Sequence, residues 1–346
     1  MSPAPVLTLM LPTRNRSAWV IRAVRSCLAQ DSPAAKLRVL VIDGHSTDGS
    51  WEKLQITFAE DPRVCLRRQE KEKGFVGACR EAVAALDSPY AGLIFDDDVL
   101  LPNYRHLLKT VVQGGFSYGF GFGRLGCLKE VLEVPTARGF WMMSPQQLLE
   151  GFLGLRGKLT TEGYPQSPMC GVFSSELWRI WAEEIRSFCS TSPWRTSCLI
   201  ERAAGPDFLI FLIALARTRR AVPVLQGVVT QFSRHDGTLT SSLQGRDLPT
   251  GYWLSFFWLH AELLRQRKAG DAANVLVHQQ KKARSLARLW DENGRKNLQD
   301  ELRQAESRSL APIPWIIRKQ AEIRGRLPRV FRIAPWTRPP YIKYLE

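Results

Sequence analysis

Residues 90–102 read YAGLIFDDDVLLP, an apolar segment that ends in three consecutive aspartates. The run from Tyr90 to Phe95 is typical of a buried β-strand, which places Asp96, Asp97 and Asp98 at its carboxyl end. Adjacent carboxylates repel one another and are costly to bury unless a cation compensates them. Their hard oxygen atoms suit Mg2+ or Mn2+, which would hold the oxygens of a substrate diphosphate. A solvated acidic turn or a helix N-cap is the alternative.

The residues before this motif alternate between strand-like and helix-like patterns. Strands are predicted at 6–11, 37–42, 64–68 and 90–95, and helices at 18–30, 49–59 and 76–86. Polar clusters follow the strands at 12–16, 43–48, 71–77 and 96–98. This order predicts an α/β fold with a parallel sheet, helices on both faces and a ligand crevice at the carboxyl ends of the strands.

Composition narrows the class of protein. The 346 residues are 45% apolar and 23% charged, enough for a sizeable core. The longest apolar run, 208–216, has nine residues, well short of the ~18 to 20 that span a bilayer. Residues 1–12 lack a secretory leader pattern, and the seven cysteines form no CxxC pair, so we expect reduced thiols in a cytoplasmic protein.

The net charge of +15 is concentrated near the C-terminus, since residues 260–346 contribute +10. Nucleic acid, anionic lipid headgroups and phosphorylated substrates are the candidate partners of such a surface. In the tail, residues 315–333 carry six Lys and Arg side chains beside Ile316, Ile323 and Leu327. This pattern predicts peripheral contact with an anionic membrane, or else a solvated tail whose apolar side packs on the core.

Four motifs occur in the order and spacing of family 2 glycosyltransferases of the GT-A fold, which the chain resembles over about residues 5–105 and more weakly to 242. They are LPTRNR at 11–16, VIDGHSTDG at 41–49, Gly74 with Arg80, and the aspartates 96–98. The resemblance implies a Rossmann-like, mostly parallel sheet flanked by helices. It also implies a GT-A domain over 1–245, with a nucleotide-binding half (1–105) and an acceptor-binding half (106–245). A mainly helical, basic region over 246–346 would follow.

The resemblance also assigns the donor site. Pro12, Thr13 and Asn15 would line the nucleotide pocket, and Asp43 would accept the imide hydrogen of uracil or thymine, unless it only caps its turn. Arg80 would lie near the base or diphosphate, unless it is a plain surface arginine. Asp96 would contact ribose or metal, Asp97 would bind the metal directly, and Asp98 would bind metal or orient the sugar. Gly44, His45 and Glu81 depart from the family pattern and leave nucleotide details open.

The second half would supply the base and the rest of the metal shell. In the stretch GPDFL (205–209), Asp207 resembles the family's catalytic base, with Glu201 in reserve; an ordinary helix N-cap is the alternative. In QFSRHDGTLTS (231–241), His235 would complete the metal shell and Arg234 would offset charge on the leaving diphosphate, unless the loop is simply solvated. Four tryptophans, Trp141, Trp178, Trp181 and Trp194, are either sugar-stacking platforms or core residues.

The predicted function is therefore a Mn2+- or Mg2+-dependent, inverting glycosyltransferase. It would move a sugar from a nucleotide-diphosphate sugar, with UDP favoured, to a hydroxyl of a cell-surface glycan, lipid-linked sugar or polysaccharide. We expect it in the cytoplasm, at the inner face of the membrane, with no nucleic acid partner. Two alternatives remain: an inactive GT-A-like basic binding module, and a nucleotidyltransferase, which residues 12–16 disfavour because they lack its glycine-rich loop.

Overall fold

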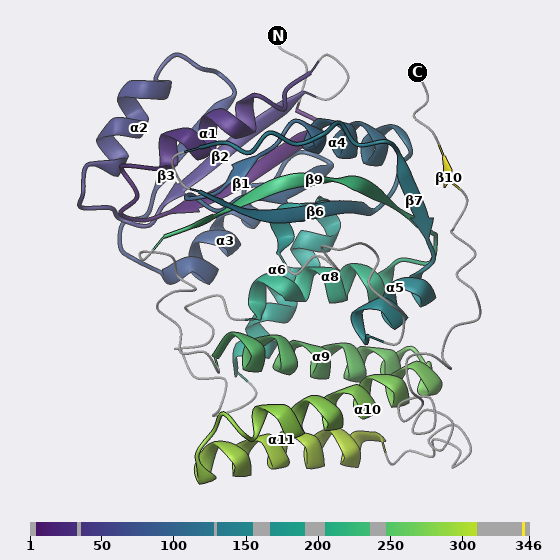
Figure 1. Cartoon of the computed structure of the whole chain (residues 1–346). Helices are drawn as coiled ribbons and strands as arrows, with labels where there is room; N and C mark the ends of the chain where they lie inside the picture. Colours follow the sequence, from purple (N-terminus) through teal and green to yellow (C-terminus); the bar gives the residue numbers. More distant parts are fainter. Residues whose placement is uncertain are drawn as a thin grey trace.

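A computed structural model describes residues 5–32, 36–127, 130–154, 167–190, 205–235, 247–309 and 341–342. Its centre is one sheet in the order β10-β7-β9-β6-β8-β4-β1-β2-β3, with the short strand β5 paired to β9 (Figure 1). Helices cover both faces, and the helices formed by residues 247–309 make a further layer below them (Figure 1). The predicted α/β class with a helical C-terminal region is confirmed.

The first half of the chain forms the expected parallel strands. β1 pairs in parallel with both β2 and β4, and β2 pairs with β3. The bounds are β1 Leu7–Thr13, α1 Val20–Leu28, β2 Leu37–Asp43, α2 Ser50–Phe58, β3 Val64–Arg68, α3 Gly74–Ala84 and β4 Tyr90–Leu93. β1 and almost all of β2 are buried along their whole length, because helices lie on both faces of a parallel sheet.

The second half turns the sheet into a mixed one. β8 runs antiparallel to β4 and β6, whereas β9 runs parallel to β6. The bounds are β5 Val99–Leu100, α4 Asn103–Gln113, β6 Tyr118–Cys127, β7 Phe140–Met143, α5 Pro145–Phe152, η1 Pro168–Cys170, β8 Gly171–Ser174, α6 Ser175–Ser190, α8 Pro206–Arg217 and β9 Val222–Arg234. Glycines of β6 permit close approach to β9: a Cβ at Gly121 would lie 2.6 Å from Val229 Cγ1.

β5 is a strand that the sequence pattern did not predict. Val99 and Leu100 follow the aspartate triplet directly and pair antiparallel with Gln231 and Thr230 of β9. Two residues give no periodicity to detect, and the partner strand lies 130 residues further along the chain. This pairing draws the end of β9 toward the triplet.

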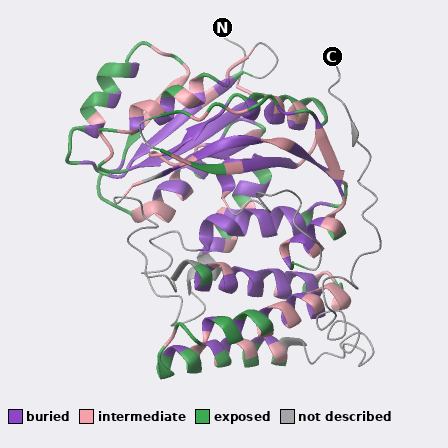
Figure 2. Ribbon diagram, in the orientation of Figure 1, coloured by how far each residue is buried: buried purple, intermediate pink, exposed green. Residues whose placement is uncertain are grey.

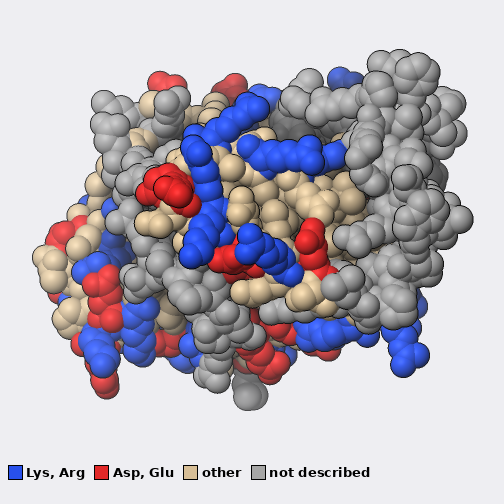
Figure 3. Space-filling model, turned by 90° about the horizontal axis from the view of Figure 1, so that it is seen from below, with Lys and Arg blue, Asp and Glu red and all other residues tan. Residues whose placement is uncertain are grey.

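The C-terminal layer consists of α9 Asp247–Arg265, α10 Ala269–Leu286 and α11 Glu292–Ser309, and β10 Tyr341–Ile342 pairs with β7. Seen from the side of α11, the described surface carries both basic and acidic side chains (Figure 3). Exposed residues gather on α2 and on the outer faces of α10 and α11 (Figure 2). None of the described helices combines the length and the apolar character that crossing a bilayer requires.

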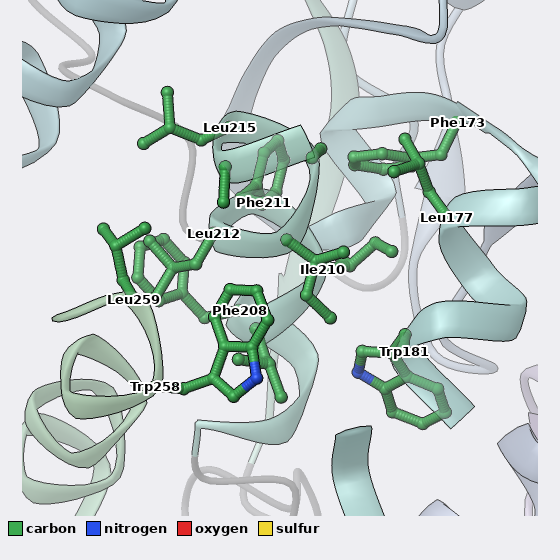
Figure 4. Packing of buried hydrophobic residues seen from close by; sticks show 14 of the residues in the cluster. Phe173, Leu177, Trp181, Phe208, Ile210, Phe211, Leu212, Leu215, Trp258 and Leu259 are labelled. Atoms are coloured by element: carbon green, nitrogen blue, oxygen red, sulfur yellow. The ribbon is translucent and has the colours of Figure 1, made fainter. Parts of the chain in front are cut away.

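The core extends without a break from the sheet into the C-terminal layer. α8 is buried at every position from Pro206 to Ala216, as its apolar sequence predicts. The aromatic ring of Phe208 in α8 packs on Tyr252 and Phe256 of α9, and the opposite side of α8 faces α6 (Figure 4). Trp178 and Trp181 of α6 are fully buried, so they are core residues and not sugar-stacking platforms. Trp194 lies outside the described residues.

Candidate active site

The loops that follow β1 and β2 are held together by hydrogen bonds. The amide of Asn15 donates to Ser46 Oγ (2.9 Å), and the amide of Thr47 donates to Asn15 Oδ1 (2.8 Å). Asn15 has a φ of 53°, a left-handed conformation that asparagine tolerates better than most residues. The predicted pocket residue Asn15 therefore shapes the loop, because its acceptor oxygen is engaged by Thr47.

Pro12 and Thr13 lie at the buried carboxyl end of β1, as their sequence positions predict. Their register partners on β2 are Ile42 and Asp43. Thr13 Oγ1 is buried and makes no hydrogen bond of ordinary geometry, but it lies close enough to Asp96 to lower the pKa of that carboxyl. A polar atom in this state at the edge of a crevice is available to a ligand.

Asp43 is fully buried and only half satisfied. Its Oδ2 accepts from the amide of Ser46 (3.0 Å) and lies 3.4 Å from Nε of Arg68, whereas Oδ1 has no hydrogen-bond partner. Arg68 also donates to the carbonyl of Ser46 (2.7 Å). One acceptor atom thus remains for a donor such as the imide N–H of a base.

Arg68 is a site residue that the sequence pattern missed. It ends β3 directly opposite Asp43 in the parallel register. The sequence holds a signal for this pair, because two adjacent parallel strands end at the same edge of the sheet and Asp43 and Arg68 stand at the two strand ends. Its guanidinium lies over the ring of Trp51, 5.7 Å from the centroid, which fixes it beside the carboxylate.

The first aspartate of the triplet faces the β1 loop. The amide of Arg14 donates to Asp96 Oδ2 (3.3 Å), and Arg16 Nε lies 3.6 Å from Oδ1. Burial, and then the charge of Asp97, raise the pKa of Asp96 to about 7. A positive ligand would lower that pKa and keep the carboxylate ionised.

The second aspartate meets the predicted histidine. Asp97 Oδ2 lies 2.9 Å from His235 Nε2, although 138 residues separate them in the chain. The ring of Trp19 packs on His235, with centroids 5.1 Å apart. Both side chains are only slightly exposed, at 13% for Asp97 and 15% for His235.

This pair has the chemistry of a partial metal site. Among the described residues, no group of three or more His, Cys, Asp and Glu side chains could hold a metal ion. Ions that bind substrate phosphates, however, need only one or two carboxylates from the protein. The carboxylate of Asp97 therefore fits Mn2+ or Mg2+ whose remaining ligands would come from a diphosphate and water, and the imidazole in contact with it would add a nitrogen ligand.

The third aspartate, Asp98, contacts the end of β9. Asp98 is 5% exposed, and its Oδ1 accepts from the amide of Ser233 on β9 (2.6 Å). Burial and the neighbouring Asp97 raise its pKa well above the ordinary value. Asp98 joins the triplet to β9 through its Oδ1, whereas the carboxylate of Asp97 contacts His235.

The two predicted arginines lie on different elements, Arg80 on α3 and Arg234 at the end of β9. Arg80 on α3 is half-buried, and its Nε is buried without a hydrogen-bond partner, unlike a plain surface arginine. Arg234 ends β9 opposite Cys127, but its side chain lies outside the described part of the structure. The same is true of Glu201 and of residues 315–333.

Asp207 lies near the start of α8 and is 8% exposed. Its Oδ1 accepts from the amide of Phe208 (2.8 Å), and burial raises its pKa to about 7. Cys79 of α3 and Tyr252 of α9 lie close enough for its charge to raise their pKa values. A carboxylate with a pKa near neutrality suits a general base better than an ordinary aspartate does.

Comparison with known proteins relates part of the chain to glycosyltransferases. Residues 8–162 match the model of Glycosyl transferase family 2. Over 148 residues, 42% of this chain, the sequence is 28% identical to WcaA of Escherichia coli K12, whose name assigns it to colanic acid biosynthesis. Over 99 residues, 29% of this chain, it is 34% identical to chondroitin synthase of Escherichia coli. The aligned segments span 52% and 14% of the lengths of these relatives.

A solved structure extends the likeness of fold to nearly the whole chain. The crystal structure of S. aureus TarS 1-349 in complex with UDP-GlcNAc superposes with a TM-score of 0.59. The superposition covers 92% of this chain and 90% of that one at 11% sequence identity, so it shows the fold alone. The chain has the GT-A fold, and its residues 8–162 match the model of Glycosyl transferase family 2.

Proposed function

We propose that this protein transfers a sugar from a nucleoside diphosphate sugar to a hydroxyl group of a glycan, lipid-linked or polysaccharide acceptor. The observation that carries the proposal is the contact between Asp97 and His235 at the edge of the sheet where Asp43 keeps a free acceptor. UDP is the favoured nucleotide, since Asp43 Oδ1 suits the imide N–H of uracil. TarS, which shares the fold, was crystallised with UDP-GlcNAc.

Each residue has a distinct task in this reaction. Asp43 and Arg80 bind the nucleotide, while Asp96 is available to its ribose. Asp97 and His235 hold Mn2+ or Mg2+, which when bound supplies positive charge to the departing diphosphate. Arg234 adds to that charge from the end of β9.

The acceptor is activated by Asp207. This carboxylate removes the proton from the acceptor hydroxyl as its oxygen attacks the anomeric carbon, and the bond to the diphosphate breaks in the same displacement. No nucleophile of the chain intervenes, so the configuration at the anomeric carbon inverts. The names of WcaA and chondroitin synthase support a polysaccharide acceptor.

The decisive test is release of UDP from a panel of UDP-sugars, with and without Mn2+, by the wild type, Asp97→Asn and Asp87→Asn. Asp87 pairs with Arg38 on the surface and is 61% exposed, so its variant controls for loss of one carboxylate. We expect Mn2+-dependent release by the wild type and Asp87→Asn, and a loss of about 100-fold or more in Asp97→Asn. Equal release by all three would overturn the role of Asp97 as a metal ligand, and no release from any sugar would favour an inactive binding module.

We also propose that the basic segment 315–333 contacts anionic headgroups at the inner face of the membrane. Its six Lys and Arg side chains could each contribute roughly 1 kcal/mol near such a surface. Co-sedimentation with vesicles of anionic and of neutral lipid tests this contact. Binding only to the anionic vesicles, weakened by salt, is the expected result, whereas equal partition to both contradicts the proposal.

A further inference from the structure

One face of α1 is directed at the aspartate triplet and the end of β9. Trp19, just before the helix, packs on His235, and Arg22 and Ser26 follow at intervals of three and four residues. Ser26 Oγ accepts from the amide of Leu100 in β5 (3.1 Å). Residues at this spacing share one face of a helix, so α1 contacts the site from a single side.

Arg22 is at the centre of this face. Its Nη2 donates to the backbone carbonyl of Asp97 (2.7 Å) and to Ser233 Oγ (2.9 Å). The amide of the same Ser233 donates to Asp98 Oδ1. One guanidinium nitrogen therefore joins three parts of the chain, namely α1, the aspartate turn and β9.

The hydrogen bonds of Arg22 reach the backbone near both Asp97 and His235. Asp97 is itself held by Arg22 through its carbonyl, and His235 lies two residues after Ser233. The two side chains come from segments far apart in the sequence, so their separation depends on what fixes both backbones. Partners outside the ligand shell that fix such groups typically account for 10- to 100-fold in metal affinity.

We propose that Arg22 is a positioning residue, which sets the distance between Asp97 and His235 and thereby the affinity of the site for a divalent cation with a nucleoside diphosphate. The inference rests on the proposed function of that site. Arginine suits this task because one rigid, always charged group presents several donors in a plane. Lysine carries a single ammonium on a flexible four-carbon stem, so its donors are held less rigidly.

The test compares Arg22→Met, Arg22→Lys and the control Arg25→Met. Arg25 lies on the exposed side of the same helix, so its variant makes the same chemical change away from the site. Binding of Mn2+ in the presence of UDP is followed by the electron paramagnetic resonance signal of the free ion. We expect about 10- to 100-fold weaker Mn2+ binding in Arg22→Met, a smaller loss in Arg22→Lys and wild-type affinity in Arg25→Met.

Two further measurements separate positioning from a general loss of structure. Hydrogen exchange of a peptide covering residues 228–235 should rise in Arg22→Met but not in Arg25→Met, because Ser233 loses its partner. Binding of UMP without metal should change less than twofold, since Asp43 and Arg68 lie at the ends of β2 and β3 and, within the described part of the chain, make no hydrogen bond to Arg22.

The outcomes distinguish this inference from the function on which it rests. Wild-type protein that binds no Mn2+ with UDP overturns the proposed function and this inference with it. Wild-type binding that Arg22→Met retains at full strength overturns the inference alone. Loss of UMP binding together with Mn2+ binding in Arg22→Met also overturns it, because the residue then supports the fold and not the cation site.

Discussion

At the scale of single residues, the candidate site stands out by carboxylates whose environment opposes their charge. Burial raises the pKa of both Asp96 and Asp207 to about 7. The two differ in their neighbours, because Asp96 lies against Asp97 and Arg16, while Asp207 lies among α8, Cys79 and Tyr252. A cation would relieve the first arrangement, whereas the second gives Asp207 a pKa near neutrality, which suits the role of base proposed for it.

Asp207→Asn is expected to stabilise the protein most at alkaline pH. Between the ordinary pKa of 3.8 and the folded value of about 7, the folded state binds more protons than the unfolded state, so stability falls as pH rises through this range. The variant has no such titration. Its free energy of unfolding relative to the wild type should therefore be about 2 to 3 kcal/mol higher at pH 8 than at pH 5. Urea unfolding at both values measures the difference.

The same variant should lose about 100-fold or more in turnover if Asp207 is the base. Glu70→Gln, which removes an exposed carboxylate, serves as the control and should change neither property. Equal destabilisation of Asp207→Asn at pH 5 and pH 8 would contradict the argument. That result would mean that Asp207 serves as a charged residue at the start of α8, the alternative role that its sequence position allows.

At the scale of elements, the junction between α8 and α9 is built around one glycine. Gly205 precedes α8 with a φ of 100°, and a Cβ there would overlap the carbonyl oxygen of Gly251 and lie 2.9 Å from Ser255 Oγ. Ser255 Oγ donates to the carbonyl of Gly205 (3.0 Å). The close approach fixes the direction in which α8, and with it Asp207, enters the core.

Gly205→Ala should therefore lower the free energy of unfolding by about 3 kcal/mol, from backbone strain and overlap together. The matched control is Gly49→Ala. Gly49 has a φ of 83° but no atom within 4 Å of its would-be Cβ, so strain alone should cost about 1 kcal/mol. Denaturant unfolding of both variants measures these values, and equal losses would show that contact with α9 is unimportant.

At the scale of the whole molecule, the predicted division at residue 245 crosses a shared core. Buried residues of α9, α10 and α11 belong to the same hydrophobic cluster as those of the sheet and α8. Phe208 alone contacts rings from two positions of α9. The boundary at residue 245 between a GT-A domain and a helical region thus stays a prediction. The hydrophobic core is continuous across it.

A chain that ends at residue 245 is expected not to fold. Removal of α9 would uncover Phe208 and Leu212 of α8, and each large apolar side chain contributes about 1.5 to 3 kcal/mol by burial. For these two side chains alone the loss is about 3 to 6 kcal/mol, comparable to the lower end of the ~5 to 15 kcal/mol by which domains are stable. Cooperative thermal unfolding of residues 1–245, followed by circular dichroism, would contradict this expectation.

The amino-acid sequence by itself determined the α/β class, the polar motifs at the strand ends and the buried helix that begins near Asp207. These features depend on short-range patterns, namely the alternation of apolar runs with helical spacing and the polar residues that follow each strand. Asp43, Asp97 and His235 could be named because the motifs around them resemble those of family 2 glycosyltransferases. The absence of β5 from the predicted elements shows the limit, since two residues carry no periodicity.

Only the tertiary structure decided which groups meet. It brought His235 to Asp97 and turned Asp98 toward β9, and it placed Arg68 and Arg22 where the site needs a positive charge. These contacts join segments separated by 25 to 138 residues. Such pairing is set by the register of strands and the packing of α1 against them, and no local pattern in the sequence records either.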